Sequence, residues 1–163
     1  MKCPKCDAQV NEQMRRCSKC GQELDVIKRI LRISNVYYNS GLEKAKVRDL
    51  SGAVDALRKS LLYNKRNIQA KNLLGLVFQE MGESVSALSE WVLSKYFQQE
   101  DNLADYYINL IQNNPAELEN MNQAVKKYNA SLSAAKTGSG DLAIIQLKKV
   151  ITLNPKFLRA YQL

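Results

Sequence analysis

The stretch from Ser34 to Asp101 decides the fold, because it divides into two segments of equal length. Residues 34–67 read SNVYYNSGLEKAKVRDLSGAVDALRKSLLYNKRN, and residues 68–101 read IQAKNLLGLVFQEMGESVSALSEWVLSKYFQQED. Small and large residues recur at the same places in both segments. The equivalent pairs are Gly41 and Gly75, Leu42 and Leu76, Ala53 and Ala87, Leu57 and Trp91, and Ser60 and Ser94. A period of 34 residues shared by several positions indicates a repeated structural unit.

The alternation of small and bulky residues predicts a pair of helices in each unit. A small residue at a fixed place lets two helices approach closely, and a bulky residue one turn later fills the space beside it. The pattern resembles the tetratricopeptide (TPR) repeat, which implies an all-α solenoid of antiparallel helix pairs. Two features depart from the family: Lys44 stands where it has an aromatic residue, and neither segment ends in proline. The alternative is an ordinary helical bundle.

A third unit follows at about residues 124–157, with Gly138 at its turn and Asn154-Pro155 at its end. Ala143 lies one 34-residue period plus 22 residues after Ala87, so a segment at about 102–123 is read as an insertion that carries a short helix, Leu103 to Gln112. That helix either wedges between repeats or covers the binding surface as a lid, and the tight turn after it favours the wedge. A fourth unit starts at residues 158–163 without a partner helix, which suggests a fragment of a longer chain.

Hydrophobic periodicity and breakers give bounds for the other helices. Asn114 is expected to cap a helix that has Pro115 at its first position. Gly82 is expected to end a helix in the left-handed conformation. The predicted helices are Asp25 to Val47, Ser51 to Tyr63, Ile68 to Met81, Glu83 to Phe97, Pro115 to Lys136 and Leu142 to Leu153.

All four cysteines lie in the first twenty residues, as two Cys-x-x-Cys pairs: Cys3 with Cys6, and Cys17 with Cys20. Two such pairs can complete a tetrahedral shell around one metal ion, for which zinc is the first choice. Residues 1–23 resemble the short zinc-ribbon modules found at the ends of many bacterial proteins. Four thiolates close the coordination shell, so we expect a structural zinc ion. Two disulfides, a redox Cys-x-x-Cys motif and iron are the alternatives.

The sequence contains nothing that indicates an enzyme. It has no histidine, which removes Ser-His, Cys-His and His-metal catalysis, and it has no phosphate-binding loop or dinucleotide fingerprint. It also lacks an apolar run long enough to span a membrane and has no N-terminal signal segment. We therefore expect a cytoplasmic protein without membrane contact.

The resemblance to TPR arrays implies a concave groove, lined by the first helix of each repeat, that holds a protein or peptide partner. For Tyr38 and Leu42 the alternative is packing within the array. The predicted groove residues are Asn35, Tyr38, Leu42, Lys46, Gln69, Asn72, Leu76 and Gln79, followed by Val125, Tyr128, Leu132 and Lys136 if the third unit stays in line.

The second hypothesis is a nucleic-acid-associated adaptor that uses the basic N-terminal region. The chain has a formal net charge of +8, or about +6 once four thiolates hold a divalent ion. In the first 32 residues, eight lysines and arginines stand against four acidic residues. Basic side chains on a ribbon can contact phosphates. That segment has no aromatic residue on which a base could stack, so the groove remains the leading hypothesis.

Overall fold

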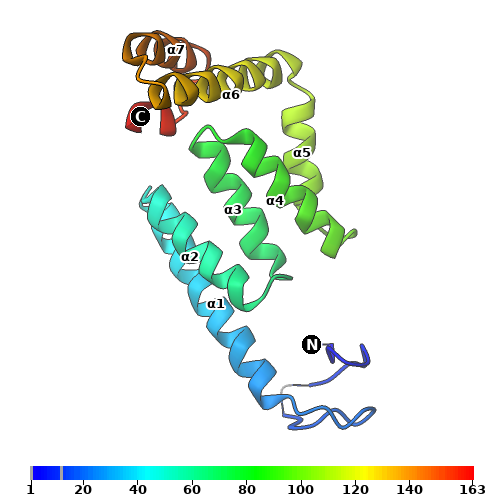
Figure 1. Cartoon of the computed structure of the whole chain (residues 1–163). Coiled ribbons are helices and arrows are strands. Elements are labelled where there is room, and N and C mark those ends of the chain that lie inside the picture. Colours follow the sequence, from blue (N-terminus) through cyan, green and yellow to red (C-terminus); the bar gives the residue numbers. More distant parts are fainter. Residues whose placement is uncertain (1, 12) are drawn as a thin grey trace.

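A computed structural model describes residues 2–11 and 13–163 of the chain (Figure 1). These residues form eight α-helices and no strand longer than an isolated bridge. The expected all-α class is therefore confirmed. The helices are α1 (Asp25–Lys46), α2 (Leu50–Tyr63), α3 (Ile68–Glu80), α4 (Ser84–Phe97), α5 (Ala104–Gln112), α6 (Pro115–Lys136), α7 (Gly140–Leu153) and α8 (Arg159–Gln162).

The ends of the helices follow from local chemistry, and the predicted bounds differ from the observed ones by a residue or two. Three side chains cap helices by accepting a backbone N–H: Asp49 caps α2, Asn67 caps α3 and Asn114 caps α6. Pro115 is the first residue of α6, as expected. Gly82 has φ +73° between α3 and α4, which confirms the predicted left-handed position.

Neighbouring helices pack as antiparallel pairs: α1 with α2, α3 with α4, and α6 with α7 (Figure 1). In the first two pairs a glycine allows close approach. A Cβ at Gly41 would lie 2.7 Å from Cγ of Leu57, and a Cβ at Gly75 would lie 2.2 Å from Nε1 of Trp91. Leu57 and Trp91 are the bulky residues of the 34-residue pattern, and both are buried. The small and large positions in the sequence therefore meet across each pair.

Helix α5 keeps the 34-residue register, which the sequence-based reading as an insertion did not recognise. Asn67 donates from Nδ2 to Oγ of Ser60, at 3.3 Å, just before α3. Asn102, which follows Asn67 by 35 residues, makes a similar bond to Ser94, at 3.1 Å, just before α5. The 34-residue spacing is restored at Ala104, which is buried like Ala70. Helix α5 packs on α4 as α3 packs on α2. It therefore packs on α4 where the first helix of a further pair would lie, and it ends early, at Gln112.

Helices α6 and α7 repeat α1 and α2 at a distance of 90 residues. Both first helices have 22 residues and both second helices have 14. Identical residues occur at equivalent places: Tyr38, Asn39, Leu42, Ala45 and Lys46 recur as Tyr128, Asn129, Leu132, Ala135 and Lys136. The distance of 90 residues is two 34-residue periods plus the 22-residue displacement found in the sequence, so this copy is out of step with the fixed period.

The third pair does not stack on α4 in line with the first two. Helix α5 packs against both α4 and α6, and the α6–α7 pair crosses the end of the second pair (Figure 1). The chain then returns to the turn between α3 and α4, where the backbone N–H of Leu158 donates to the carbonyl oxygen of Met81. Helix α5 thus contacts both the second and the third pair, and its role as a wedge stays a prediction.

Candidate metal centre and partner groove

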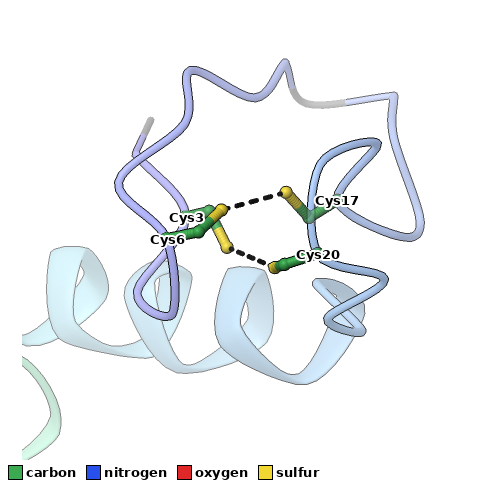
Figure 2. Close-up of side chains that lie close together, drawn as sticks. All are labelled: Cys3, Cys6, Cys17 and Cys20. Atoms are coloured by element: carbon green, nitrogen blue, oxygen red, sulfur yellow. Dashed lines mark hydrogen bonds between the residues drawn. The ribbon is translucent and has the colours of Figure 1, made fainter.

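The four cysteine side chains converge from two loops that face each other beside the start of α1 (Figure 2). Sγ of Cys3 lies 3.6 Å from Sγ of Cys20, and Sγ of Cys6 lies 3.6 Å from Sγ of Cys17. All four sulfur atoms lie within 4.8 Å of one another. Cys3 and Cys17 are buried, and Cys6 and Cys20 are half-buried. The predicted ligands are therefore brought together.

These distances fit a single metal ion. A tetrahedral centre with metal–sulfur bonds of about 2.3 Å has sulfur atoms about 3.8 Å apart. A disulfide bond needs a sulfur–sulfur distance of about 2.05 Å, and all four cysteines are free thiols. The alternative of two disulfides does not describe this arrangement. The cluster could bind a metal ion such as zinc.

The two cysteine loops have the same backbone geometry. In each loop the N–H of the first cysteine donates to a carbonyl five residues later, and the carbonyl of the first cysteine accepts from an N–H four residues later. In both loops, the residue that precedes the carbonyl group accepting the first cysteine's N–H has positive φ. The equivalent residues are Cys3, Asp7 (φ 52°) and Ala8 in one loop and Cys17, Gly21 (φ 71°) and Gln22 in the other. Each loop is thus a closed turn that presents two sulfur atoms.

Backbone amides and neighbouring thiols act on the acidity of the sulfur atoms. The backbone N–H groups of Cys20 and Lys19 stabilise the thiolate of Cys17 and lower its pKa to about 6. At Cys6 the backbone at Ala8 acts in the lowering direction, but burial and the other thiols raise the pKa to about 12. One thiolate is therefore favoured without a cation, whereas four adjacent thiolates require one.

Apolar residues attach these loops to α1. Val10 and Leu24 are buried together with Cys3 and Cys17, and Ile27 of α1 packs against them. The backbone N–H of Leu24 donates to the carbonyl oxygen of Arg15, and Nζ of Lys28 donates to the carbonyl oxygen of Met14. The metal-binding loops are thus joined to the first helix by a small core of their own.

The predicted groove positions of α1 are divided between solvent and core. Asn35 and Lys46 are exposed, whereas Tyr38 and Leu42 are half-buried. Tyr38 packs against the core of the first two helix pairs. The alternative that Tyr38 packs within the array therefore has direct support.

Two of the four predicted groove positions of α3 line a hollow. Gln69 is exposed, and Asn72 is half-buried and donates from its side chain to Oδ1 of Asn102. Leu76 and Gln79 line a hollow of about 290 Å³ whose remaining wall residues come from the next three helices. These are Trp91 of α4, Tyr107, Leu110 and Ile111 of α5, and Glu117 of α6.

The predicted positions of α6 lie apart from that hollow. Val125, Tyr128 and Leu132 are half-buried and Lys136 is exposed. The ring of Tyr128 packs edge-on against Phe157, with centroids 5.1 Å apart. Since the third pair does not stack in line, α6 contributes Glu117 to the hollow and none of these four residues.

Sequence reasoning did not include the α5 residues in the groove. The signal was present, because Tyr107, Leu110 and Ile111 lie 34 residues after Leu73, Leu76 and Val77. The ring of Tyr107 lies 5.3 Å from that of Trp91, and Leu110 is 54% exposed. Helix α5 therefore supplies one wall of the surface that the second repeat was expected to present.

Comparison with known proteins adds no family assignment: no protein-family description matches this chain, and no curated protein matches it. Within residues 2–11 and 13–163, no helix combines the length and the apolar character needed to cross a lipid bilayer.

Proposed function

We propose that this chain is a non-enzymatic, cytoplasmic TPR-type adaptor that binds a protein or peptide partner in the hollow between α3, α4 and α5, with one structural zinc ion in an N-terminal ribbon. The observation that carries the proposal is the hollow itself. Its walls are mostly apolar, and they come from four consecutive helices, α3 to α6. Such a concave apolar site with a few polar groups is typical of ligand recognition.

The walls indicate the chemistry of the partner. Leu76 and Leu110 offer aliphatic surface, Trp91 and Tyr107 offer aromatic surface, and Glu117 adds a carboxylate at the rim. A bulky apolar side chain of a peptide or helix would cover Leu110, which is 54% exposed, and remove apolar area from water. Anchors of this kind provide most of the affinity of such interfaces.

The polar groups of α3 could orient a partner. Oε1 of Gln79 and Oδ1 of Asn72 are shielded from water and accept no hydrogen bond within the described residues. A buried acceptor without a donor is costly. Rotation of the Gln79 amide toward the hollow would let it pair with a backbone group of a bound peptide.

Zinc is proposed for the cysteine cluster on donor chemistry. Four thiolates form the donor set of closed, structural zinc sites. In such a site the ion would stabilise the fold of the ribbon, because about twenty residues bury too little apolar surface to fold unaided. Cys3, Cys6, Cys17 and Cys20 would hold it, and their backbone amides would keep the thiolates oriented.

Selection of a phage-displayed library of random short peptides on the full chain tests the groove. We expect peptides with a bulky apolar anchor to be enriched, and Leu76→Lys and Leu110→Lys each to weaken their binding at least tenfold. Leu62→Lys is the matched control, because Leu62 is exposed on α2 and does not line the hollow. Peptides that bind all three variants equally would show that the hollow is not the site.

A further inference from the structure

The apolar hollow at α5 contains a carboxylate that has no cationic partner. Glu117, in the first turn of α6, lines this hollow together with Tyr107 of α5. Its side chain forms no ion pair with any residue that the structure describes. Lys156 lines a neighbouring hollow with Glu117, but its Nζ pairs with Glu80 at 3.5 Å. The fold therefore leaves one negative charge of the hollow unpaired.

The cap of α6 holds this carboxylate in place. Oδ1 of Asn114 accepts the backbone N–H of Glu117 at 3.3 Å, and Nδ2 of Asn114 donates to Oε2 of Glu117 at 2.9 Å. The start of a helix also favours a negative charge. Oε1 of Glu117 accepts no hydrogen bond within the described residues. One oxygen atom thus fixes the position of the carboxylate, and the other stays available to a ligand.

A second acceptor belongs to the same hollow. Gln79 lines it, and Oε1 of Gln79 is shielded from water without a hydrogen-bond donor among the described residues. A partner that fills the hollow displaces water from the carboxylate of Glu117. A charge that is covered without a partner of opposite sign is costly. The hollow therefore favours a ligand that brings a cationic donor group beside its apolar anchor.

An aromatic ring in the hollow narrows the choice of cation. Tyr107 is half-buried, and its ring packs on that of Trp91 with centroids 5.3 Å apart and planes 31° apart. A guanidinium group stacks on an aromatic face and donates several hydrogen bonds in one plane. An ammonium group is a compact charge that holds water more strongly. Guanidinium is thus the cation that suits an aromatic ring together with two acceptors.

We propose that the partner carries an arginine close to its bulky apolar anchor, and that this arginine pairs with Glu117 and stacks on Tyr107. The inference rests on the proposed function, because it concerns the same hollow. Cover of Leu110 by the anchor removes apolar area from water, and the arginine supplies the charge that Glu117 lacks. An acidic or neutral peptide with the same anchor would leave Glu117 covered and unpaired, so the carboxylate also selects against such peptides.

A double-mutant cycle with neutral isosteres tests this pair on the full chain. The probe is a phage-selected peptide whose binding is lost in Leu110→Lys, synthesised once with its arginine and once with citrulline, which keeps the shape and removes the charge. On the parent chain, citrulline should weaken binding about tenfold or more in fluorescence anisotropy, as expected for a close charged pair. On Glu117→Gln the two peptides should bind nearly equally.

Glu119→Gln is the matched control for the cycle. It makes the same charge change two residues further along α6, and Glu119 is exposed and does not line the hollow. The two peptides should therefore differ on this variant as they do on the parent chain. Thermal unfolding of the two variants should coincide, because a glutamine at position 117 keeps a side-chain oxygen that can accept Nδ2 of Asn114.

Three outcomes would overturn the inference. An equal effect of citrulline on the parent chain and on Glu117→Gln would show that the arginine contacts another group. Selected peptides that need Leu76 and Leu110 but contain no arginine would show that the hollow takes an apolar ligand alone, and the proposed function would then stand without this inference. A selection that yields no binder would remove both.

Discussion

The side-chain amide of Asn154 donates a hydrogen bond to the carbonyl oxygen of Gly82, at 2.9 Å, across 72 residues of sequence. Beside it, Nε of Arg159 lies 2.8 Å from the buried carboxylate of Glu83. These contacts fasten the end of α7 to the turn between α3 and α4. Oδ1 of Asn154 also accepts the backbone N–H of Lys156, two residues later. Asn64, at the equivalent place after α2, accepts the N–H of Arg66 in the same way. Among the described residues, the Asn side chain joins distant parts of the chain in the second copy alone.

The contact at Gly82 predicts that substitution of this glycine lowers the free energy of unfolding by an unusually large amount. Gly82→Ala places a side chain at φ +73° and sets its Cβ 2.7 Å from the backbone of Lys156 and Phe157. The conformation costs about 1 to 2 kcal/mol, and the clash adds about 1 to 3 kcal/mol. Gly138→Ala is the control, because it has φ +77° and open space around it. Urea unfolding should show the larger loss for Gly82→Ala; equal losses would mean that the α7 end does not sit on this turn.

The contact between Gly75 and Trp91 gives a second prediction. An added Cβ would lie 2.2 Å from the indole Nε1, and that nitrogen donates to the carbonyl oxygen of Asn72. Trp91 is buried and must shift, so Gly75→Ala should lower stability by about 1 to 3 kcal/mol. Gly140→Ala, with open space at the start of α7, should be neutral or slightly stabilising. Thermal unfolding would measure the stability of both variants. An unchanged melting temperature for Gly75→Ala would contradict the packing of α3 on α4.

Helix α5 should contribute strongly to stability if it is a wedge. Ile111 is buried, and Tyr107 packs on Trp91. Truncation of each to alanine should cost about 2 to 5 kcal/mol, as measured by chemical denaturation. Tyr106→Ala is the control, because Tyr106 is 60% exposed. A double variant, Tyr107→Ala with Ile111→Ala, that keeps its stability and binds selected peptides more tightly would show instead that α5 acts as a lid.

The metal proposal predicts about one zinc ion per chain by elemental analysis after anaerobic purification. Cys17→Ser should abolish stoichiometric zinc and expose the Arg15, Arg16 and Lys19 bonds to trypsin. Far-UV circular dichroism should change little, because the helices have a core separate from the cysteine loops. Ser18→Ala is the control. Recovery of metal-free protein with two disulfides would refute the site.

Asp49 gives a prediction about pH. The hydrogen bond from Nζ of Lys44 and the backbone N–H of Gly52 lower the pKa of Asp49 from its ordinary value of 3.8. Because the folded state has the lower pKa, the contribution is fully present above that ordinary value and is lost as the pH falls through the folded value. Asp49→Asn should therefore reduce the loss of stability below pH 4, whereas Asp55→Asn, on the exposed side of α2, should not. Urea unfolding at a series of pH values would compare the two.

The sequence by itself determined where the helices lie, that Asn114 caps a helix, that Gly82 is left-handed and that the four cysteines form one cluster. These depend on local chemistry: a 3.6-residue apolar period, a side chain that accepts a nearby N–H, and two short loops with fixed ligand spacing. The contact of Gly75 with Trp91 could also be anticipated, because the 34-residue period preserves the pairing of small and large residues.

The tertiary structure alone decided how the third helix pair sits and which residues surround the hollows. The direction of the chain after α5 depends on contacts that are distant in sequence, such as those of Asn154 with Gly82 and Arg159 with Glu83. A turn of a few residues at Asn113 and Asn114 can send α6 in several directions, and only the sum of such contacts selects one. Glu117 of α6 lines the same hollow as Leu76 for that reason, and Tyr128 does not.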